Sequence, residues 1–425
     1  KDTDKQIVRD GFETLYNFMI KYNRANGRTT EYENKYDEMI QHFSKRLLEL
    51  AYPSADIYFD MLQEKYLIAY KSTHEKIKTS YQYHDIHTFK HILENVLNQR
   101  DFINEILTYI RENNIMLTDD DEKSLENAIK QLRKTIKQEA VASIQKIRET
   151  TYRPREPRVI EYQTPAGTIL SFNIYIPSKY DALERTDELS YDDVLEIMKN
   201  EHQTILAILK NLSNNHRKKL RFLIEYTAHK AKFVEKVDTA LLIYGPQGSG
   251  KSLYAGKVLR EAVGSDNYIE IGDREMNSQF NGFLKGKRLI VFDEVKVDKE
   301  NTSAIAYLKR YITQDEITVN EKHYRLEKYD NYADYILFSN FDTPIKIEDS
   351  DRRFFIMRSG LPLVDTKTAE ILSPHLKELG YTRMQDVIQD FRRQVDSYIK
   401  TLLRMRVDVN FLRYDLWTEE KEEMM

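Results

Sequence analysis

Residues 240–252 read ALLIYGPQGSGKS, and this stretch decides the fold of the chain. An apolar run of strand-forming residues leads into glycines, then into Lys251-Ser252, and then into a helical pattern that Gly264 is placed to end. This order of strand, loop and helix satisfies the pattern G-x-x-x-x-G-K-[ST] in the context that the pattern requires, which an ordinary Gly-rich turn does not provide. The sequence therefore predicts that the chain binds a nucleoside triphosphate.

Each residue type in this phosphate loop has a chemical reason. Glycines let the backbone curl with its N–H groups pointing inward, and the helix that follows adds further N–H groups and the positive end of its dipole. Lys251 is expected to reach the β- and γ-phosphates of ATP, and the Ser252 hydroxyl to ligate Mg²⁺. The expected nucleotide-binding residues are Gly245, Pro246, Gln247, Gly248, Ser249, Gly250, Lys251 and Ser252.

Composition limits the classes of protein to consider. With 425 residues, of which 41% are hydrophobic, the chain can form about two to four packed domains. The net charge of −4 gives no global polycation, so any contact with nucleic acid must come from a local patch or a ring. The absence of cysteine excludes disulfides and fits a reducing compartment, and no apolar run approaches membrane-spanning length. We expect a cytoplasmic protein with no membrane partner.

The first 150 residues are expected to form a mainly helical domain. Residues 28–150 contain no glycine and one proline, Pro53, which together with heavy charge favours helices. A long helix is predicted after an N-cap at Thr118 and an acidic first turn at residues 119–122. Its apolar seam is expected to comprise Leu125, Ile129, Leu132, Ile136, Ile144 and Ile147.

For two groups of residues in this region, metal binding is an alternative to a structural role. The acids at 119–122 could hold the divalent metal of a primase, although a helix cap is favoured. The imidazoles of His84, His87 and His91 fall at helical spacing and could hold a metal, although a solvated helix face is favoured because no fourth ligand is placed nearby.

A linker and a second helical region precede the phosphate loop. Residues 153–158 read RPREPR and predict an extended basic linker. Residues 159–162 and 168–176 alternate like two strands. The pattern is helical from 184 to 236 and includes the basic cluster at 216–221, for which a solvated face is favoured over a DNA contact.

After the phosphate loop, strands alternate with helices, which is typical of a parallel α/β sheet. Residues 288–294 read RLIVFDE and predict a buried strand that ends in two carboxylates. Asp293 is suited to hold Mg²⁺ through water, and Glu294 to polarise the attacking water as a general base.

A hairpin and a further strand follow. Residues 317–320 and 324–326 are expected to be the strands of a hairpin with Lys322 and His323 at its basic tip. The next strand ends in Asn340, and ligand sites in open sheets lie at the carboxyl ends of strands. We therefore expect the Asn340 amide beside the γ-phosphate, where it could orient the attacking water.

Two arginines come shortly after that strand. Arg352 and Arg353 could stabilise charge on the transferred phosphoryl group. In a closed ring of subunits they would act on the nucleotide of the neighbouring subunit.

This series of elements resembles the superfamily 3 helicases, AAA+ motors of small viruses, phages and mobile genetic elements. The similarity covers residues 220–357. Within it, Asn340 matches the sensor-1 asparagine of the family, Arg352 its arginine finger and Arg353 a second finger. Lys322-His323 lie where parvovirus- and papillomavirus-type helicases carry a DNA-gripping hairpin tip. Residues 173–177, NIYIP, are similar to the Asn-x-Tyr-x-Pro element of poxvirus- and phage-type primase-helicases.

The resemblance implies an architecture and a function. The expected fold is an α/β AAA+ core (a parallel sheet of the P-loop NTPase type), with a mainly α-helical N-terminal domain before it and a helical C-terminal segment after it. The expected function is that of a hexameric ring that hydrolyses ATP with Mg²⁺ and moves 3′→5′ on single-stranded and forked DNA, serving replication of a phage, plasmid or genomic island. A primase and origin DNA are further candidate partners.

The expected domains are a helical domain at 1–150, a linker with a β-hairpin at 151–183, the helicase domain at 184–360 and a helical segment at 361–425. The first could be an oligomerisation collar, a DNA-binding domain or a primase-docking domain, and the last could be the start of a truncated winged-helix region.

Two other classes of function stay open at this point. One is an ATP-driven remodeller or loader that acts on proteins, which the Lys322-His323 hairpin tip distinguishes from a helicase. The other is a DNA-binding initiator whose nucleotide acts only as a switch. Glu294 distinguishes that class, because a switch tolerates slow hydrolysis and a motor does not.

Overall fold

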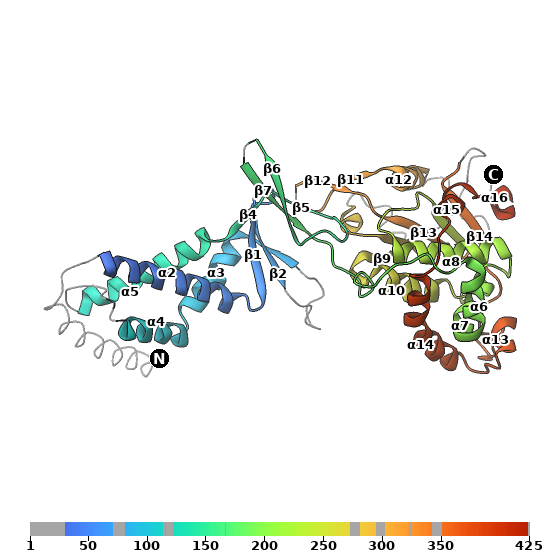
Figure 1. Ribbon diagram of the computed structural model, residues 1–425, viewed down its shortest axis with the longest axis horizontal. Coiled ribbons are helices and arrows are strands. Elements are labelled where there is room, and N and C mark those ends of the chain that lie inside the picture. The colour runs from blue at the N-terminus through green and yellow to red at the C-terminus, as the bar shows by residue number, and fades with distance from the viewer. Residues whose placement is uncertain are drawn as a thin grey trace. The chain divides into compact units, whose positions relative to one another are not determined.

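The computed structural model describes residues 30–70, 81–113, 115, 122–165, 167–272, 281–294, 302–322, 325–341 and 351–423. The chain divides into two compact units (Figure 1). Unit 1 comprises residues 1–150 and 161–171, and unit 2 comprises residues 151–160 and 172–425.

Unit 1 combines long helices with a small sheet. Its described helices are α2 (Thr30–Ala51), α3 (Ile86–Leu97), α4 (Arg100–Glu112) and α5 (Glu122–Ala142). Its strands β1 (Ala55–Asp60), β2 (Lys65–Tyr70), β3 (Tyr81–His84) and β4 (Gln145–Ile147) form a sheet in the order β3-β2-β1-β4.

The sequence analysis expected helices throughout this region and did not anticipate the sheet. β1 and β2 pair antiparallel, and Leu67 and Ile68 in the middle of β2 are fully buried. Their turns are made without glycine, because Ser54 and Glu64 themselves adopt positive φ angles of 57° and 56°. Positive φ is uncommon for residues other than glycine, so a search for glycine and proline passes over such turns.

Two further expectations for this region are corrected by the structure. The long helix α5 ends at Ala142, so Ile144 and Ile147 are not part of its seam, and Ile147 instead lies in β4. The predicted N-cap at Thr118 lies outside the described residues.

The three histidines do not share one helical face. His84 ends β3, where its Nδ1 lies 3.0 Å from the Tyr52 hydroxyl oxygen, whereas His87 and His91 are exposed on α3. Asp85 between them caps α3 by accepting a hydrogen bond from the Thr88 N–H at 2.8 Å. Within the described parts of the chain, no group of three or more potential ligands could hold a metal ion.

Three short strands follow α5 and β4. They are β5 (Glu149–Thr151), β6 (Val159–Thr164) and β7 (Gly167–Asn173), in the order β5-β7-β6. The basic linker lies between β5 and β6, and a single buried side chain shapes it. Asn173 accepts a hydrogen bond from the Arg153 N–H and donates from its amide nitrogen to the carbonyl oxygens of Arg153, Glu156 and Pro157. The first residue of the Asn-x-Tyr-x-Pro element therefore holds the linker in shape.

The centre of unit 2 is a five-stranded sheet in which every pair of neighbouring strands is parallel. Its strands are β8 (Ala240–Tyr244), β9 (Tyr268–Ile271), β10 (Leu289–Phe292), β13 (Asp334–Ser339) and β14 (Phe354–Arg358), in the order β14-β8-β13-β10-β9. Because β13 lies between β8 and β10, the carboxyl ends of these three strands meet at one edge of the sheet.

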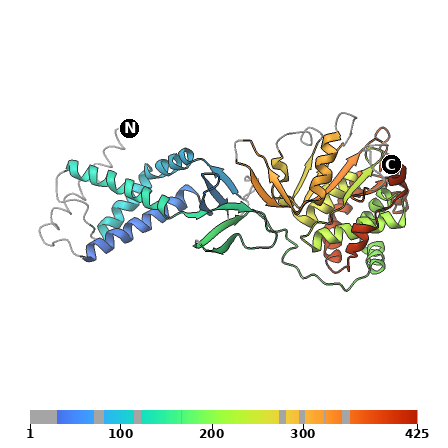
Figure 2. The same ribbon diagram turned by 90° about the horizontal axis from the view of Figure 1, so that it is seen from above.

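Helices before and after the sheet in sequence pack together on it (Figures 1 and 2). Those before it are α6 (Tyr191–Glu201), α7 (Gln203–Leu212) and α8 (Arg217–Lys232). Those between its strands are α9 (Lys251–Leu253), the π-helical turn η1 (Tyr254–Leu259), α10 (Arg260–Val263), the 3₁₀ turns η2 (Ser265–Asn267) and η3 (Gly282–Leu284), and α12 (Thr302–Thr313). Those after it are α13 (Pro374–Glu378), α14 (Met384–Leu402), α15 (Val409–Tyr414) and α16 (Glu419–Glu423).

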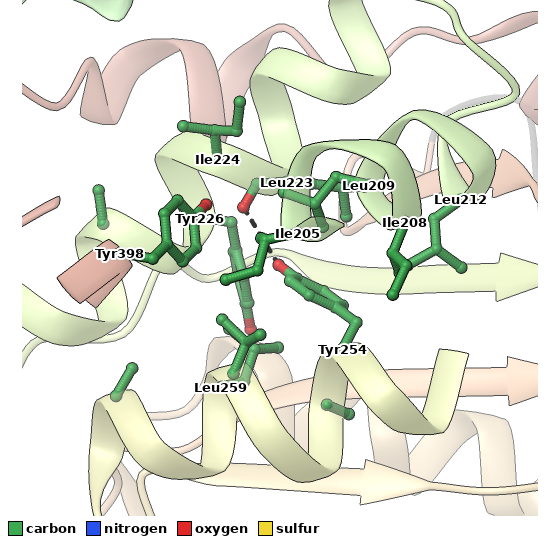
Figure 3. Packing of buried hydrophobic residues seen from close by; sticks show 14 of the residues in the cluster. Ile205, Ile208, Leu209, Leu212, Leu223, Ile224, Tyr226, Tyr254, Leu259 and Tyr398 are labelled. Atoms are coloured by element: carbon green, nitrogen blue, oxygen red, sulfur yellow. Dashed lines mark hydrogen bonds between the residues drawn. The ribbon is translucent and has the colours of Figure 1, made fainter. Parts of the chain in front are cut away.

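One hydrophobic core joins α6, α7, α8, α10, α13, α14 and α15 to the sheet (Figure 3). It brings Ile208 of α7 and Leu223 of α8 together with Tyr254, which follows the phosphate loop, and Tyr398 of α14. The Tyr254 hydroxyl donates to the Leu223 carbonyl oxygen at 3.1 Å, which satisfies its buried polar atom. The described part of the C-terminal segment is therefore a helical part of unit 2.

The basic cluster at 216–221 is a solvated face only in part, because His216 and Arg217 are exposed whereas its other basic residues are paired. Lys218 pairs with Asp415 and Lys219 with Glu420, while the Arg221 guanidinium lies 2.6 Å from the Glu225 carboxylate in the same helix. Lys219 is buried, so this cluster fixes the last part of the described chain to α8.

Candidate functional site

The predicted loop lies at the carboxyl end of β8, which is buried along its whole length. Gly245, Gly248 and Gly250 all have positive φ angles, and α9 begins at Lys251. A Cβ at Gly245 would lie 2.4 Å from the Ser359 hydroxyl oxygen, so this glycine is also required by close packing. The helix that follows ends at Val263 with Gly264 as its C-cap, as the sequence predicts.

Segments outside the loop determine the direction in which its backbone faces. The Gly248 carbonyl oxygen accepts from the Leu363 N–H at 2.9 Å, and the Ser249 carbonyl oxygen accepts from the Asn211 amide at 3.0 Å. In a trans peptide the C=O of one residue and the N–H of the next point in opposite directions. The N–H groups of Ser249 and Gly250 therefore point away from these partners, which is the orientation an anion-binding nest needs.

Lys251 lies over this loop. Its side-chain nitrogen donates to the carbonyl oxygens of Gly245 at 2.9 Å and Pro246 at 3.0 Å, and to the Asn340 side-chain oxygen at 3.2 Å. Burial lowers the pKa of Lys251, and the Asp293 carboxylate opposes that effect only in part. A buried ammonium with mainly neutral partners favours the arrival of an anion.

Asn340 and the two carboxylates lie at the same edge as the loop. Asn340 follows β13 directly, and Gly245 donates its N–H to the Ser339 carbonyl oxygen at 3.1 Å, so the loop begins beside the end of β13. Asp293 follows β10, and Glu294 has a positive φ of 59° and donates its N–H to the Asp293 carboxylate at 3.0 Å. This backbone turn separates the two carboxylates, with Asp293 half-buried and Glu294 exposed.

The structure therefore brings together Lys251, Asp293 and Asn340, which the sequence placed on three separate elements. Ser252 and Gln247 are exposed at the same loop. This arrangement combines an ammonium, oriented backbone N–H groups, a hydroxyl, two carboxylates and an amide. These are the groups that phosphate and Mg²⁺ require.

Arg352 and Arg353 lie away from this group of side chains in the fold. The Arg353 carbonyl oxygen accepts from the Ala240 N–H at 2.8 Å, and β14 then runs parallel to β8 with Phe354 beside Ala240. Ala240 and Gly245 are separated along the strand by about 16 Å at roughly 3.3 Å per residue. Arg352 and Arg353 are thus at the opposite end of the sheet from the phosphate loop of their own chain.

The expected hairpin exists, but its second strand begins later than predicted. β11 (Glu316–Val319) pairs antiparallel with β12 (Glu327–Asp330), whereas residues 324–326 had been expected to form the strand. Lys322 is exposed in the connecting loop, and His323 lies outside the described residues.

Asn211 is a residue of the site that the sequence analysis missed. It is buried at the end of α7, and its amide nitrogen donates to the carbonyl oxygens of Ser249 at 3.0 Å and Leu361 at 2.9 Å. The one available signal was a polar residue among the apolar residues of α7, which Lys210 beside it also shows. Its two partners are far away in sequence, so no local pattern assigns it to the loop.

Asn211→Ala is expected to lower the free energy of unfolding by about 1–3 kcal/mol, because it removes the donor from the buried Ser249 carbonyl oxygen and from the Leu361 carbonyl oxygen. Urea denaturation measures this change. The matched control is Asn200→Ala on the exposed face of α6, which should change stability by about 0.5 kcal/mol or less. Equal effects of the two substitutions would contradict the role of Asn211 at the loop.

The sequence of this region is similar to a protein family and to a known phage protein. Residues 243–353 match a family model described as a family of unknown function, DUF5906. The chain is also 28% identical over 279 residues to the DNA primase-polymerase of Nitratiruptor phage NrS-1, a match that covers 64% of this chain and 34% of that protein. The match thus spans about a third of the length of the curated relative.

Solved structures give a similar picture of the fold. The apo structure of the NrS-1 C-terminal region superposes with a TM-score of 0.61 at 20% identity, covering 90% of this chain and 73% of that one. A second apo form of the same region gives a TM-score of 0.60 over the same coverage. No helix among the described residues is long and apolar enough to cross a membrane. The chain thus shares its fold with the C-terminal region of that phage protein.

Proposed function

We propose that this chain is the ATP-driven DNA motor of a phage or mobile-element replication protein, an AAA+ ATPase of the superfamily 3 type. The observation that carries the proposal is the convergence of Lys251, Asp293 and Asn340 at the carboxyl ends of β8, β10 and β13. The similarity to a phage DNA primase-polymerase supports a role in DNA replication and makes a primase a candidate partner.

Each residue then has a part in ATP hydrolysis. Lys251 and the N–H groups of Ser249 and Gly250 bind the phosphates, and the Ser252 hydroxyl and the Asp293 carboxylate are the ligands available to Mg²⁺, which neutralises phosphate charge when it is bound. Glu294 is the general base for the attacking water.

Asn340 has a separate part in the same step. Because its side-chain oxygen accepts from Lys251, its amide N–H groups are left to orient the water or a γ-phosphate oxygen.

Arg352 completes the site of the neighbouring subunit. It is exposed, and its guanidinium has no hydrogen bond or ion pair within the described parts of the chain, whereas the Arg353 guanidinium contacts Asp351 at 3.4 Å. With Arg352 at the far end of the sheet from its own loop, a head-to-tail ring would bring each Arg352 to the next subunit's phosphates. This geometry favours Arg352 over Arg353 as the finger. The hexamer and its 3′→5′ movement on single-stranded DNA are proposed from the resemblance to superfamily 3 helicases alone.

The loop between β11 and β12 grips DNA in this proposal. Asn281 attaches this hairpin to the segment before β10, because its side chain accepts from the Asn320 N–H at 2.6 Å and donates to the Thr318 carbonyl oxygen at 2.9 Å. That segment leads through β10 into Asp293, so a change at the nucleotide has a short path to Lys322 that runs along β10 and through the two Asn281 hydrogen bonds. Lys322 is exposed and available to DNA phosphates.

Lys322→Ala combined with His323→Ala is expected to preserve DNA-independent ATP hydrolysis and to abolish unwinding of forked DNA. A ring of six subunits would lose about six phosphate contacts, and at about 0.7 counterions per contact the salt dependence of single-strand binding should become shallower by about four log units per log unit of salt. Fluorescence anisotropy with an oligonucleotide at several salt concentrations measures the slope.

The matched control is Lys328→Ala, which removes an exposed lysine from β12 of the same hairpin. It should unwind as the wild type does. Unwinding at the wild-type rate by the Lys322/His323 variant would contradict the DNA grip and favour a remodeller that acts on proteins.

A further inference from the structure

The turn before β14 is built around Asp351, a residue without a role in the proposed reaction so far. Its side chain is 1% exposed. One carboxylate oxygen accepts from the Arg353 N–H at 3.0 Å, and the Arg353 guanidinium lies 3.4 Å from both oxygens. The Lys309 ammonium of α12 approaches the second oxygen at 2.7 Å.

These contacts leave Arg352 at the outside of the turn. The bond from the Arg353 N–H back to Asp351 restrains the two peptide groups on either side of Arg352, so its neighbours set the direction of the Arg352 Cα–Cβ bond. Burial alone would raise the pKa of Asp351, but the hydrogen bonds from Lys309 and Arg353 outweigh burial and hold that pKa below its ordinary value. The carboxylate is therefore ionised when it holds the turn.

We propose that Asp351 is a positioning residue that aims Arg352 at the neighbouring subunit, with Lys309 fixing it to α12. This inference rests on the proposed function, because Arg352 needs positioning only if it acts on the nucleotide of the neighbouring subunit. α12 is the next described helix after Asp293 and Glu294, so the ion pair joins the element that follows one subunit's carboxylates to the arginine that serves the next subunit.

A second cation from a different element faces the same carboxylate. Burial lowers the pKa of Lys421 in α16, and Asp351 is the charge that opposes this effect. The contacts that hold this buried carboxylate come from α12 and from its own turn, and Lys421 adds a positive charge from α16. Several contacts that fix one side chain are expected where a small displacement of a reacting group would lower the rate of catalysis.

Asp351→Asn tests the inference, since asparagine keeps the size of the side chain and can still accept from the Arg353 N–H but loses the charge that holds Lys309. Misplacement of a reacting group by about 1 Å costs on the order of 10²-fold in rate, so ATP hydrolysis should fall by about that factor. Lys309→Met should have a similar effect and Lys309→Arg should restore most of the activity. Asp386→Asn on α14 removes an exposed paired carboxylate and serves as the control.

Mixed assemblies separate positioning from a merely structural role. A Lys251→Ala subunit has no active site but a complete finger, whereas an Asp351→Asn subunit has a complete site but a misplaced finger. Mixing the two should recover about a quarter of the wild-type rate at equal amounts, since about a quarter of random neighbour pairs join a sound finger to a sound site. In addition, Asp351→Asn combined with Arg352→Ala should be no slower than Arg352→Ala alone, because both changes remove the same finger.

The outcomes separate the positioning role of Asp351 from the proposed action of Arg352 on the neighbouring subunit. If Arg352→Ala recovers activity on mixing with Lys251→Ala but Asp351→Asn does not, Asp351 supports its own site and the inference is overturned, while the trans finger stands. If Arg352→Ala also fails to recover at every mixing ratio, the trans finger itself is wrong, and the inference falls with it. Thermal unfolding of each variant identifies one that has failed to fold, and in that case Lys309→Met takes its place in the same mixtures.

Discussion

Arg352→Ala is expected to lower the rate of ATP hydrolysis by the assembled protein by about 10³–10⁵-fold, which is the contribution of arginine fingers in other phosphoryl-transfer enzymes. Arg352 is exposed at the far end of the parallel sheet, and its guanidinium makes no hydrogen bond or ion pair with a described residue. Its removal should therefore leave folding and stability unchanged. Steady-state hydrolysis and thermal unfolding, measured side by side, check both expectations.

The substitution to lysine sharpens this test. A lysine keeps one positive charge but loses the planar donor pair of the guanidinium, so Arg352→Lys should recover little of the activity. A matched control is Arg383→Ala, which removes an exposed arginine near the start of α14. ATP hydrolysis by Arg352→Ala at the wild-type rate would show that Arg352 is not an arginine finger.

Glu294→Gln is also expected to have a large effect on ATP hydrolysis. The substitution keeps the shape of the side chain but removes its basic oxygen, so hydrolysis should fall by about 10²–10⁴-fold while ATP binding is retained. Glu294 is exposed and its backbone has a positive φ, which glutamine tolerates no worse than glutamate does. Single-turnover hydrolysis, together with titration of a fluorescent ATP analogue, measures the two effects separately.

The same variant distinguishes a motor from a switch. A motor that cannot hydrolyse ATP should bind forked DNA without unwinding it, whereas an initiator switched by nucleotide binding would keep its function. Glu196→Gln on α6, which removes an exposed carboxylate paired with Lys199, is the control. Hydrolysis at the wild-type rate by Glu294→Gln would mean that another group activates the water.

Local chemistry made the conformation of residues 240–264 predictable. The turns at Gly245 and Gly250 need positive φ, the strand before them is uniformly apolar, and Gly264 ends the helix after them. Each of these is a property of a few consecutive residues. The same holds for β10, whose apolar run ends in Asp293, and for β13, which ends beside Asn340.

Contacts between distant parts of the chain were not predictable in this way. Asn211 lies 38 residues from Ser249 and 150 residues from Leu361 in the sequence, and no local pattern in α7 predicts a contact with either of them. The basic cluster around Lys219 was interpreted from charge alone, and its partner Glu420 lies 201 residues away. A single sequence shows residue types and local periodicity. Which distant residues contact each other depends on the whole fold, and neither residue type nor periodicity determines that fold alone.

The sheet of unit 1 was missed for a different physical reason. Residues 55–70 have strand-forming side chains, but the absence of glycine and proline was given more weight than their β-branched and aromatic content. Ser54 and Glu64 make the turns at positive φ themselves. The end of α5 at Ala142 was missed because apolar spacing continued past it into Ile144 and β4.

The central claim is that residues 240–252 bind and hydrolyse ATP with the help of Asp293 and Asn340. The most direct measurement is ATP hydrolysis by the wild-type chain with and without single-stranded DNA, beside Lys251→Ala, with the mass of the assembly determined in the same buffer. We expect a multi-subunit assembly whose ATP hydrolysis is stimulated by single-stranded DNA and abolished by Lys251→Ala. Equal rates for the wild type and Lys251→Ala would contradict it.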